Sequence, residues 1–155
     1  MGHNPVNHPL RPIYRALGAF TGAYLVLFGI LGVIMTGDDG LFGNGDDRVL
    51  GQHTNLFWSL VAVLLGAIVL VATVLGRNLD TVIDKYVGWG LLVVGSYSLG
   101  AIRTDANFLN FSISTVVVTY LLGLVLIMAA YYSKVAPPEQ AGSPRQARER
   151  QAQSA

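Results

Sequence analysis

The feature that most constrains this chain is a series of four long apolar stretches. They cover roughly residues 16–36, 55–76, 82–102 and 108–133. A helix rises about 1.5 Å per residue, so about 20 apolar residues cross the roughly 30 Å hydrocarbon core of a bilayer. Open-edged strands are excluded as spans, because lipid cannot satisfy their backbone groups. The sequence therefore predicts an all-α membrane protein, a four-transmembrane-helix bundle over residues 16–135.

The low content of charged residues supports this class. Asp, Glu, Lys and Arg make up 12% of the chain, whereas soluble domains carry about 25%. The absence of cysteine excludes disulfides and thiolate metal sites. The net charge of +1 offers no basic face for nucleic acid. Membrane lipid is the expected surrounding, and no nucleic acid partner or cofactor is predicted.

The basic residues are divided unevenly between the two sides of the predicted bundle. Eight of the ten fall on the side of the two termini and of the connection near residue 77. Because basic residues concentrate on the cytoplasmic side, residues 1–15 and 136–155 are both predicted to be cytoplasmic. Residues 136–155 lack an apolar run and are predicted to be disordered. The eight are Arg11, Arg15, Arg77, Lys85, Lys134, Arg145, Arg148 and Arg150.

Small and hydroxyl-bearing residues recur at helical spacing on every predicted helix. Helices associate in lipid through close backbone approach and hydrogen bonds, so these residues are candidates for packing or for a subunit interface. In one interpretation, all of these faces point inward and form the core of a single tight bundle. In the other, the Gly18–Gly22 stripe lies at an interface between subunits. Two tandem helical hairpins arising by duplication remain an alternative. The candidates are Gly18, Gly22, Gly29, Ser59, Gly66, Ser96, Gly100, Thr115, Thr119 and Gly123.

The segment between the first two predicted helices is a candidate sensor or outer-loop site. His53 lies at its end, where an imidazole is able to sense pH. Carboxylates in the same segment offer hard oxygen ligands for a cation, but without the spacing of a calcium loop. The favoured interpretation is a solvated loop and a histidine bonded to Asn55 or to the loop backbone, with no metal site. The carboxylates are Asp38, Asp39, Asp46 and Asp47.

A second group of charges starts the third predicted helix. Asp80, Asp84, Lys85 and the preceding Arg77 are expected to pair with one another and to snorkel at the inner membrane interface. No charged residue is expected at mid-depth, which argues against proton transport by a buried carboxylate. Three deeper tyrosines are expected to bond to the Ser and Thr faces: Tyr24, Tyr97 and Tyr120.

The last predicted helix and the entry to the second carry a family resemblance. Residues 104–134, TDANFLNFSISTVVVTYLLGLVLIMAAYYSK, and residues 52–58, QHTNLFW, resemble a family of small actinobacterial membrane proteins known as a domain of unknown function. The resemblance covers roughly residues 15–134. It implies four helices and a bacterial plasma membrane, and it implies no activity.

The functional expectation follows from the residues that are present and from the missing motifs. The sequence contains no phosphate-binding loop, no H-E-x-x-H zinc motif and no G-x-S-x-G nucleophile motif. We therefore expect a non-enzymatic integral membrane protein that acts as a homo-oligomer or as an accessory subunit of a larger complex. One alternative is a small channel or transporter with a pathway between subunits, lined by Ser112, Thr115, Thr119 and the tyrosines. The other is an envelope pH or stress sensor.

Overall fold

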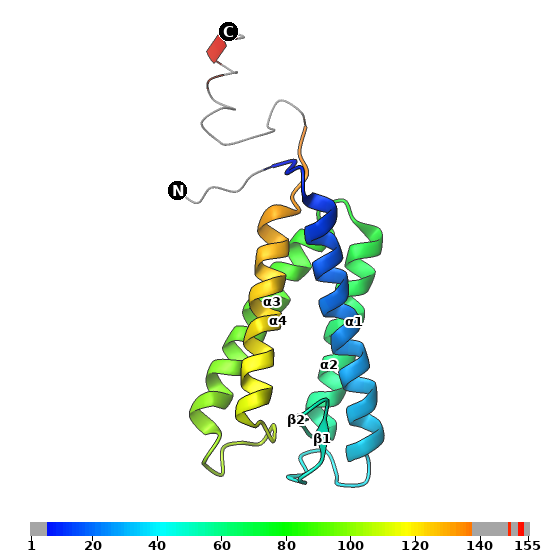
Figure 1. The fold of residues 1–155 in the computed structure, drawn as a ribbon, viewed down its shortest axis with the longest axis vertical. Coiled ribbons are helices and arrows are strands. Elements are labelled where there is room, and N and C mark those ends of the chain that lie inside the picture. The colour runs from blue at the N-terminus through cyan, green and yellow to red at the C-terminus, as the bar shows by residue number, and fades with distance from the viewer. Residues whose placement is uncertain (1–5, 138–148, 150–151, 154–155) are drawn as a thin grey trace.

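The chain folds into four helices and one short β-hairpin in the computed structural model (Figure 1), which describes residues 6–137, 149 and 152–153. The helices are α1 (Arg11–Thr36), α2 (Leu56–Leu75), α3 (Leu79–Ala101) and α4 (Ile113–Tyr132). Between α1 and α2, strand β1 (Arg48–Val49) pairs antiparallel with β2 (Gln52–His53), with Arg48 opposite His53 and Val49 opposite Gln52.

The two ends of the bundle differ in what they contain. Figure 1 shows the start of α1, the end of α4 and the α2–α3 turn at one end, which we call the terminal end. The β-hairpin and the α3–α4 connection lie at the other, which we call the loop end. The α2–α3 turn is short because three consecutive residues, Gly76, Arg77 and Asn78, have positive φ values of 62°, 54° and 68°.

The helices associate as two close pairs, α1 with α2 and α3 with α4. Each pair contains one point where two glycines meet. A Cβ atom built on Gly66 would lie 2.5 Å from the carbonyl oxygen of Gly22. Likewise, one built on Gly88 would lie 2.8 Å from the carbonyl oxygen of Gly123. Only glycine permits this backbone contact, so each close pair depends on its own glycine crossing.

The prediction of an all-helical protein with four long helices is confirmed. Three of them, α1, α2 and α4, are long and apolar enough to cross a membrane. The remaining helix, α3, carries Asp80, Asp84 and Lys85 in its first two turns, and these charges lower its hydropathy. The structure is therefore compatible with a multi-pass membrane protein.

Helix boundaries differ most from the prediction at the starts of α4 and α1. The last helix was expected to begin near residue 108, yet α4 begins at Ile113. Asn110 adopts a positive φ of 52°, and Ser112 caps α4 through a reciprocal capping box with Thr115. At the other end of the chain, α1 begins at Arg11, earlier than expected, with a proline in its first turn. The predicted disorder of residues 136–155 falls mainly outside the described residues.

Candidate functional site

The terminal end contains a buried group of charges that joins the helices. Asp80, in the first turn of α3, is only 1% exposed. Its Oδ2 lies 2.9 Å from the Nε of Arg15 and 3.9 Å from a terminal nitrogen of Arg11, both on α1. Arg15 also donates to the backbone carbonyl of Thr73 on α2. Two arginines of α1 therefore tie this helix to its neighbours.

Arg11 extends the same group to the end of α4. Its Nε donates to the backbone carbonyl of Ser133 at 2.8 Å. Beside this bond, the rings of Tyr14 and Tyr132 stack with centroids 4.9 Å apart, and His8 meets both rings edge-on. The start of α1 is thus fixed against the end of α4 by one charged hydrogen bond and an aromatic cluster.

Asp84 lies one turn beyond Asp80 and has no such partner. It is also 1% exposed, and its Oδ1 has no hydrogen-bond partner within the described part of the chain. The other oxygen, Oδ2, faces Gly18 of α1, where an added Cβ would lie 2.7 Å away. Gly18 therefore provides the space that the Asp84 carboxyl occupies. A carboxylate removed from water without a partner costs free energy, so Asp84 is the least compensated polar group of this end.

The predicted cluster of Asp80, Asp84, Lys85 and Arg77 is wrong in its arrangement. The two aspartates are buried, and Asp80 pairs with Arg15 of α1. Lys85 and Arg77 are exposed instead. A sequence signal for the observed pairing existed, because Arg11 and Arg15 are four residues apart and so are Asp80 and Asp84. Spacing of four places each pair on one helix face.

The loop end is joined by neutral hydrogen bonds. The side chain of Asn55 caps α2 by accepting from the backbone N–H of Trp58 at 3.0 Å. Its amide nitrogen donates to the carbonyl of Phe108 at 2.7 Å. Asn110 donates to the carbonyls of Gly45 and Thr54 at 2.9 and 3.1 Å. These two asparagines bind the β-hairpin segment to the α3–α4 connection.

Thr115 and Gln52 complete this network. The hydroxyl of Thr115, in the first turn of α4, donates to the backbone carbonyl of His53 at 2.8 Å. The amide of Gln52 donates to the hydroxyl of Tyr24 on α1 at 2.5 Å. Both side chains are buried, and both link the β-hairpin to a helix. The sequence did not single out Gln52, Asn55 or Asn110 as a joint network, because their partners, the Tyr24 hydroxyl and three backbone carbonyls, belong to distant parts of the chain.

His53 has a different partner from the one expected. Its Nε2 accepts a hydrogen bond from the Nε of Arg48 at 2.8 Å, across the two strands, and not from Asn55. The acidic residues of the segment are all exposed. Within residues 6–137, 149 and 152–153, no group of three His, Cys, Asp or Glu residues could hold a metal ion. The exposed residues are Asp38, Asp39, Asp46 and Asp47.

The small-residue candidates lie mostly at contacts between helices. Gly22 meets Gly66, and Gly29 meets the backbone of Ser59, both between α1 and α2. Gly123 meets Gly88, which the sequence did not single out. The stripe that includes Gly18 and Gly22 therefore faces the inside of the bundle, as in the first of the two interpretations.

The remaining candidates differ among themselves. The hydroxyl of Thr119 donates to the backbone carbonyl of Thr115 at 2.8 Å, as a hydroxyl within a helix often does. Ser96 is exposed and bonds to the hydroxyl of Tyr120 at 2.8 Å, as expected of that tyrosine. The hydroxyl of Tyr97 bonds instead to the backbone carbonyl of Ala106. Gly100 is exposed, and an added Cβ there would meet nothing within 4 Å.

Comparison with known proteins identifies no relative of the chain. No protein-family model matches the chain, and no curated protein or solved structure matches it. The resemblance to the actinobacterial family therefore stays a prediction.

Proposed function

We propose that this chain is a non-enzymatic, multi-pass protein of a bacterial plasma membrane that acts by assembling with other membrane helices. The assembly is a homo-oligomer or a larger complex in which the chain is an accessory subunit. Both termini face the cytoplasm, because eight of the ten basic residues belong to that side. The three apolar helices support the membrane location.

The observation that carries this proposal is the outward face of α1 around Phe20. The Phe20 side chain is 74% exposed and stands between two apolar hollows. One hollow, of about 270 Å³, lies between α1 and α2, and the other, of about 520 Å³, lies between α1 and α4. Ala23 lines both hollows, and Ala16 and Ala19 line the first. The face thus combines a projecting aromatic ring with two neighbouring hollows that are lined in part by alanines.

Such a face suits association with another helix. In lipid, helices associate where small side chains allow close packing, and a projecting ring gains dispersion contacts when it enters a hollow. In a two-fold symmetric dimer each copy supplies both the ring and the hollow. The glycine stripe of α1 is already engaged inside the bundle at Gly22 and Gly29. The face formed by Ala16, Ala19, Phe20 and Ala23, which we call the alanine face, is therefore a part of α1 that remains open to a partner.

Single-cysteine cross-linking tests the homo-oligomer directly, because the natural chain contains no cysteine. Phe20→Cys in native membranes should give a disulfide-linked dimer on mild oxidation. Ile34→Cys is the matched control, since Ile34 lies on the same helix, is also 74% exposed and lines neither hollow. Ala23→Leu should fill both hollows and abolish the Phe20→Cys cross-link. Equal cross-linking at positions 20 and 34 would show random collision and refute an interface at Phe20.

The accessory-subunit form is tested on the tagged chain isolated from its native membrane in mild detergent. A stoichiometric set of other membrane subunits, lost from the Ala23→Leu variant, would identify the complex. A discrete homo-oligomer would favour self-assembly. A strictly monomeric, unpartnered chain in native lipid would refute both forms.

A further inference from the structure

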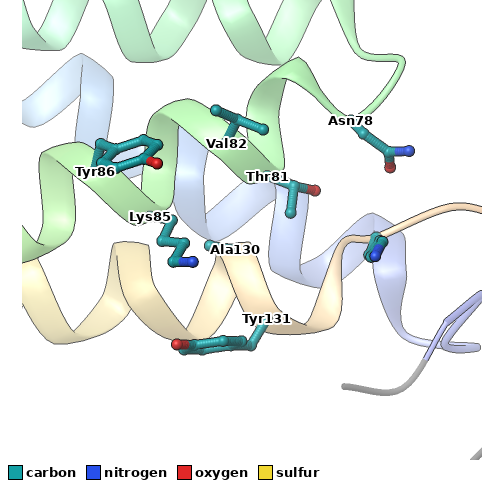
Figure 2. A pocket seen from close by; sticks show the side chains of 8 residues that line it. Asn78, Thr81, Val82, Lys85, Tyr86, Ala130 and Tyr131 are labelled. Carbon is teal, nitrogen blue, oxygen red and sulfur yellow. The ribbon is translucent and has the colours of Figure 1, made fainter. Parts of the chain in front are cut away.

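A groove at the terminal end, between the first turns of α3 and the last turns of α4, is separate from the alanine face. It has a volume of about 260 Å³. Figure 2 shows Thr81 and Lys85 on the side of α3 that faces α4, with Ala130 opposite. The lining residues are Asn78, Thr81, Val82, Lys85, Tyr86, Ala130, Tyr131 and Lys134.

Two uncompensated cations line this groove. Lys85 on α3 and Lys134 just after α4 are both exposed. Within residues 6–137, neither ammonium forms an ion pair, whereas Arg11 and Arg15 of the same end pair with Asp80. The acidic residues nearest to Lys85 in sequence, Asp80 and Asp84, are buried toward α1. The groove therefore presents positive charge on its open side.

Beside the groove lies the hydroxyl of Thr81, whose oxygen is buried. Thr21, Thr36, Thr73 and Thr119 each donate to the backbone carbonyl four residues earlier. Thr81 makes no such bond, and its Oγ1 has no hydrogen-bond partner among the described residues. A phosphate group provides acceptors for several ammonium groups, so the two exposed lysines suit the same anion.

The position of Lys134 is fixed by its neighbours. The amide nitrogen of Asn78 donates to the carbonyl of Val135 at 2.8 Å, and the backbone N–H of Val135 donates back to its Oδ1 at 2.7 Å. On the other side, Asn7 accepts from the backbone N–H of Ala136 at 3.1 Å. The segment after α4 is therefore held beside α3, and its lysine is held at the groove.

The groove continues into apolar surface along α3. Val82, Tyr86, Trp89 and Val93 follow one another at helical spacing and are all exposed. Tyr86 also lines an apolar groove of about 330 Å³ between α2 and α3, beside Gly90. A molecule with its anionic group at the lysines would therefore meet hydrocarbon-compatible surface directly below. This combination distinguishes a lipid from a soluble phosphate.

We propose that Lys85 and Lys134 bind the phosphate of an anionic phospholipid in this groove, with an acyl chain lying along Tyr86 and Trp89. The terminal end then lies at the level of the lipid headgroups in the cytoplasmic leaflet, the side to which the positive charges assign it. This site does not depend on the assembly at Phe20.

Tryptophan fluorescence gives a direct test in the full chain. Trp89 is 50% exposed below the groove, whereas Trp58 is 4% exposed, so bromine-labelled acyl chains should quench Trp89. The protein is placed in phosphatidylcholine vesicles that contain increasing fractions of dibromo-acyl phosphatidylglycerol. Quenching by dibromo-acyl phosphatidylcholine, measured separately, reports contact with lipid of any kind. Quenching by phosphatidylcholine with no preference for phosphatidylglycerol would therefore refute this site, whereas no quenching by either lipid would refute the membrane location.

The wild-type chain should prefer phosphatidylglycerol over phosphatidylcholine. Lys85→Gln and Lys134→Gln should each lower this preference about five-fold, as expected for one basic residue near an anionic surface. Arg77→Gln is the matched control, because Arg77 is an exposed cation of the same end outside the groove, and it should lower the preference less than either lysine variant. An equal loss with Arg77→Gln would assign the effect to general surface charge and overturn the site. If soluble glycerol phosphate abolishes the preference, the groove binds a free anion, and the proposal of a phospholipid ligand is refuted.

Discussion

The two ends of the bundle bury polar side chains in different ways. At the loop end, Asn55, Asn110 and Thr115 are neutral, and each side chain has partners at 2.7–3.1 Å. At the terminal end, the buried groups include the carboxylates of Asp80 and Asp84. Of these two, only Asp80 has a charged partner within 4 Å in the described part of the chain. Neutral, satisfied groups cost little to bury, whereas a lone charge costs several kcal/mol.

Because of this difference in buried polar groups, the two ends contribute to stability in different ways. The loop end joins the two helical pairs through bonds that hold in any charge state, so it supports the fold. At the terminal end, the Asp80 carboxylate has one close ion pair among the described residues, with Arg15, so the balance of buried charge depends on a single side chain. The four substitutions below test this contrast.

Loss of Arg15 should have the largest effect. Arg15→Met removes the closer of the two arginines that face the Asp80 carboxylate, at 2.9 Å against 3.9 Å for Arg11. Breaking a buried pair from one side typically costs about 3–5 kcal/mol. The free energy of unfolding, measured by titrating sodium dodecyl sulfate into dodecyl maltoside micelles and following circular dichroism, should fall by that amount.

Two further variants define the cause of that loss. Arg103→Met removes the same charge from an exposed position at the loop end and should change stability by less than about 0.5 kcal/mol. Asp80→Asn added to Arg15→Met should recover part of the lost stability, because it removes the stranded charge. A double variant no more stable than Arg15→Met alone would mean that packing, and not charge, holds this end.

Loss of Asn55 should have the next largest effect. Asn55→Ala removes the cap of α2, which is worth about 1 kcal/mol. It also leaves the Phe108 carbonyl without the amide bonded at 2.7 Å, which costs about 1–3 kcal/mol more. The same detergent titration should show a loss of about 2–4 kcal/mol. Asn44→Ala, at an exposed position of the same segment, should have almost no effect. An equal loss there would show that the hydrogen bonds of Asn55 are not the cause.

Apolar runs were enough to predict the helices, because a membrane helix needs little besides length and hydropathy. They could not place the start of α4. Residues 108–112 continue the apolar run in composition, but Asn110 turns the backbone to positive φ and Ser112 caps the helix. A hydropathy pattern does not contain either event. The sequence does contain the serine followed three residues later by Thr115, which is a variant of the capping box.

The candidate site was less predictable, because it depends on which helices are neighbours. The four-residue spacing of Asp80 and Asp84 places both on one face, but nothing local shows that this face meets Arg15 of α1. The glycine crossings have the same limit. Gly88 and Gly123 are 35 residues apart in a chain whose glycines number 18, and composition alone does not pair them.

Substitution of Asp84 should reveal the cost of the uncompensated carboxylate. Asp84→Asn keeps the shape of the side chain that fits beside Gly18 and removes its charge next to Asp80. We expect the free energy of unfolding to rise by about 1 kcal/mol, at the low end of the gain seen when buried charges are replaced. Asp47→Asn, at an exposed position, should change it by less than about 0.5 kcal/mol. A loss of stability with Asp84→Asn would show that the carboxylate has a cationic partner in the membrane.

The smallest effect is expected at His53, the candidate sensor residue. Its imidazole accepts one hydrogen bond from the partly solvated Arg48, whereas its backbone carbonyl accepts from Thr115. His53→Ala removes only the first of these bonds, so stability should fall by about 0.5 kcal/mol or less. Thr115→Val removes the second and should cost about 1–3 kcal/mol, since a buried carbonyl loses its donor. The two variants are compared by detergent titration at pH 5.5 and 7.5. If His53→Ala costs as much as Thr115→Val at either pH, the loop end depends on a titratable side chain after all, and the contrast between the two ends fails.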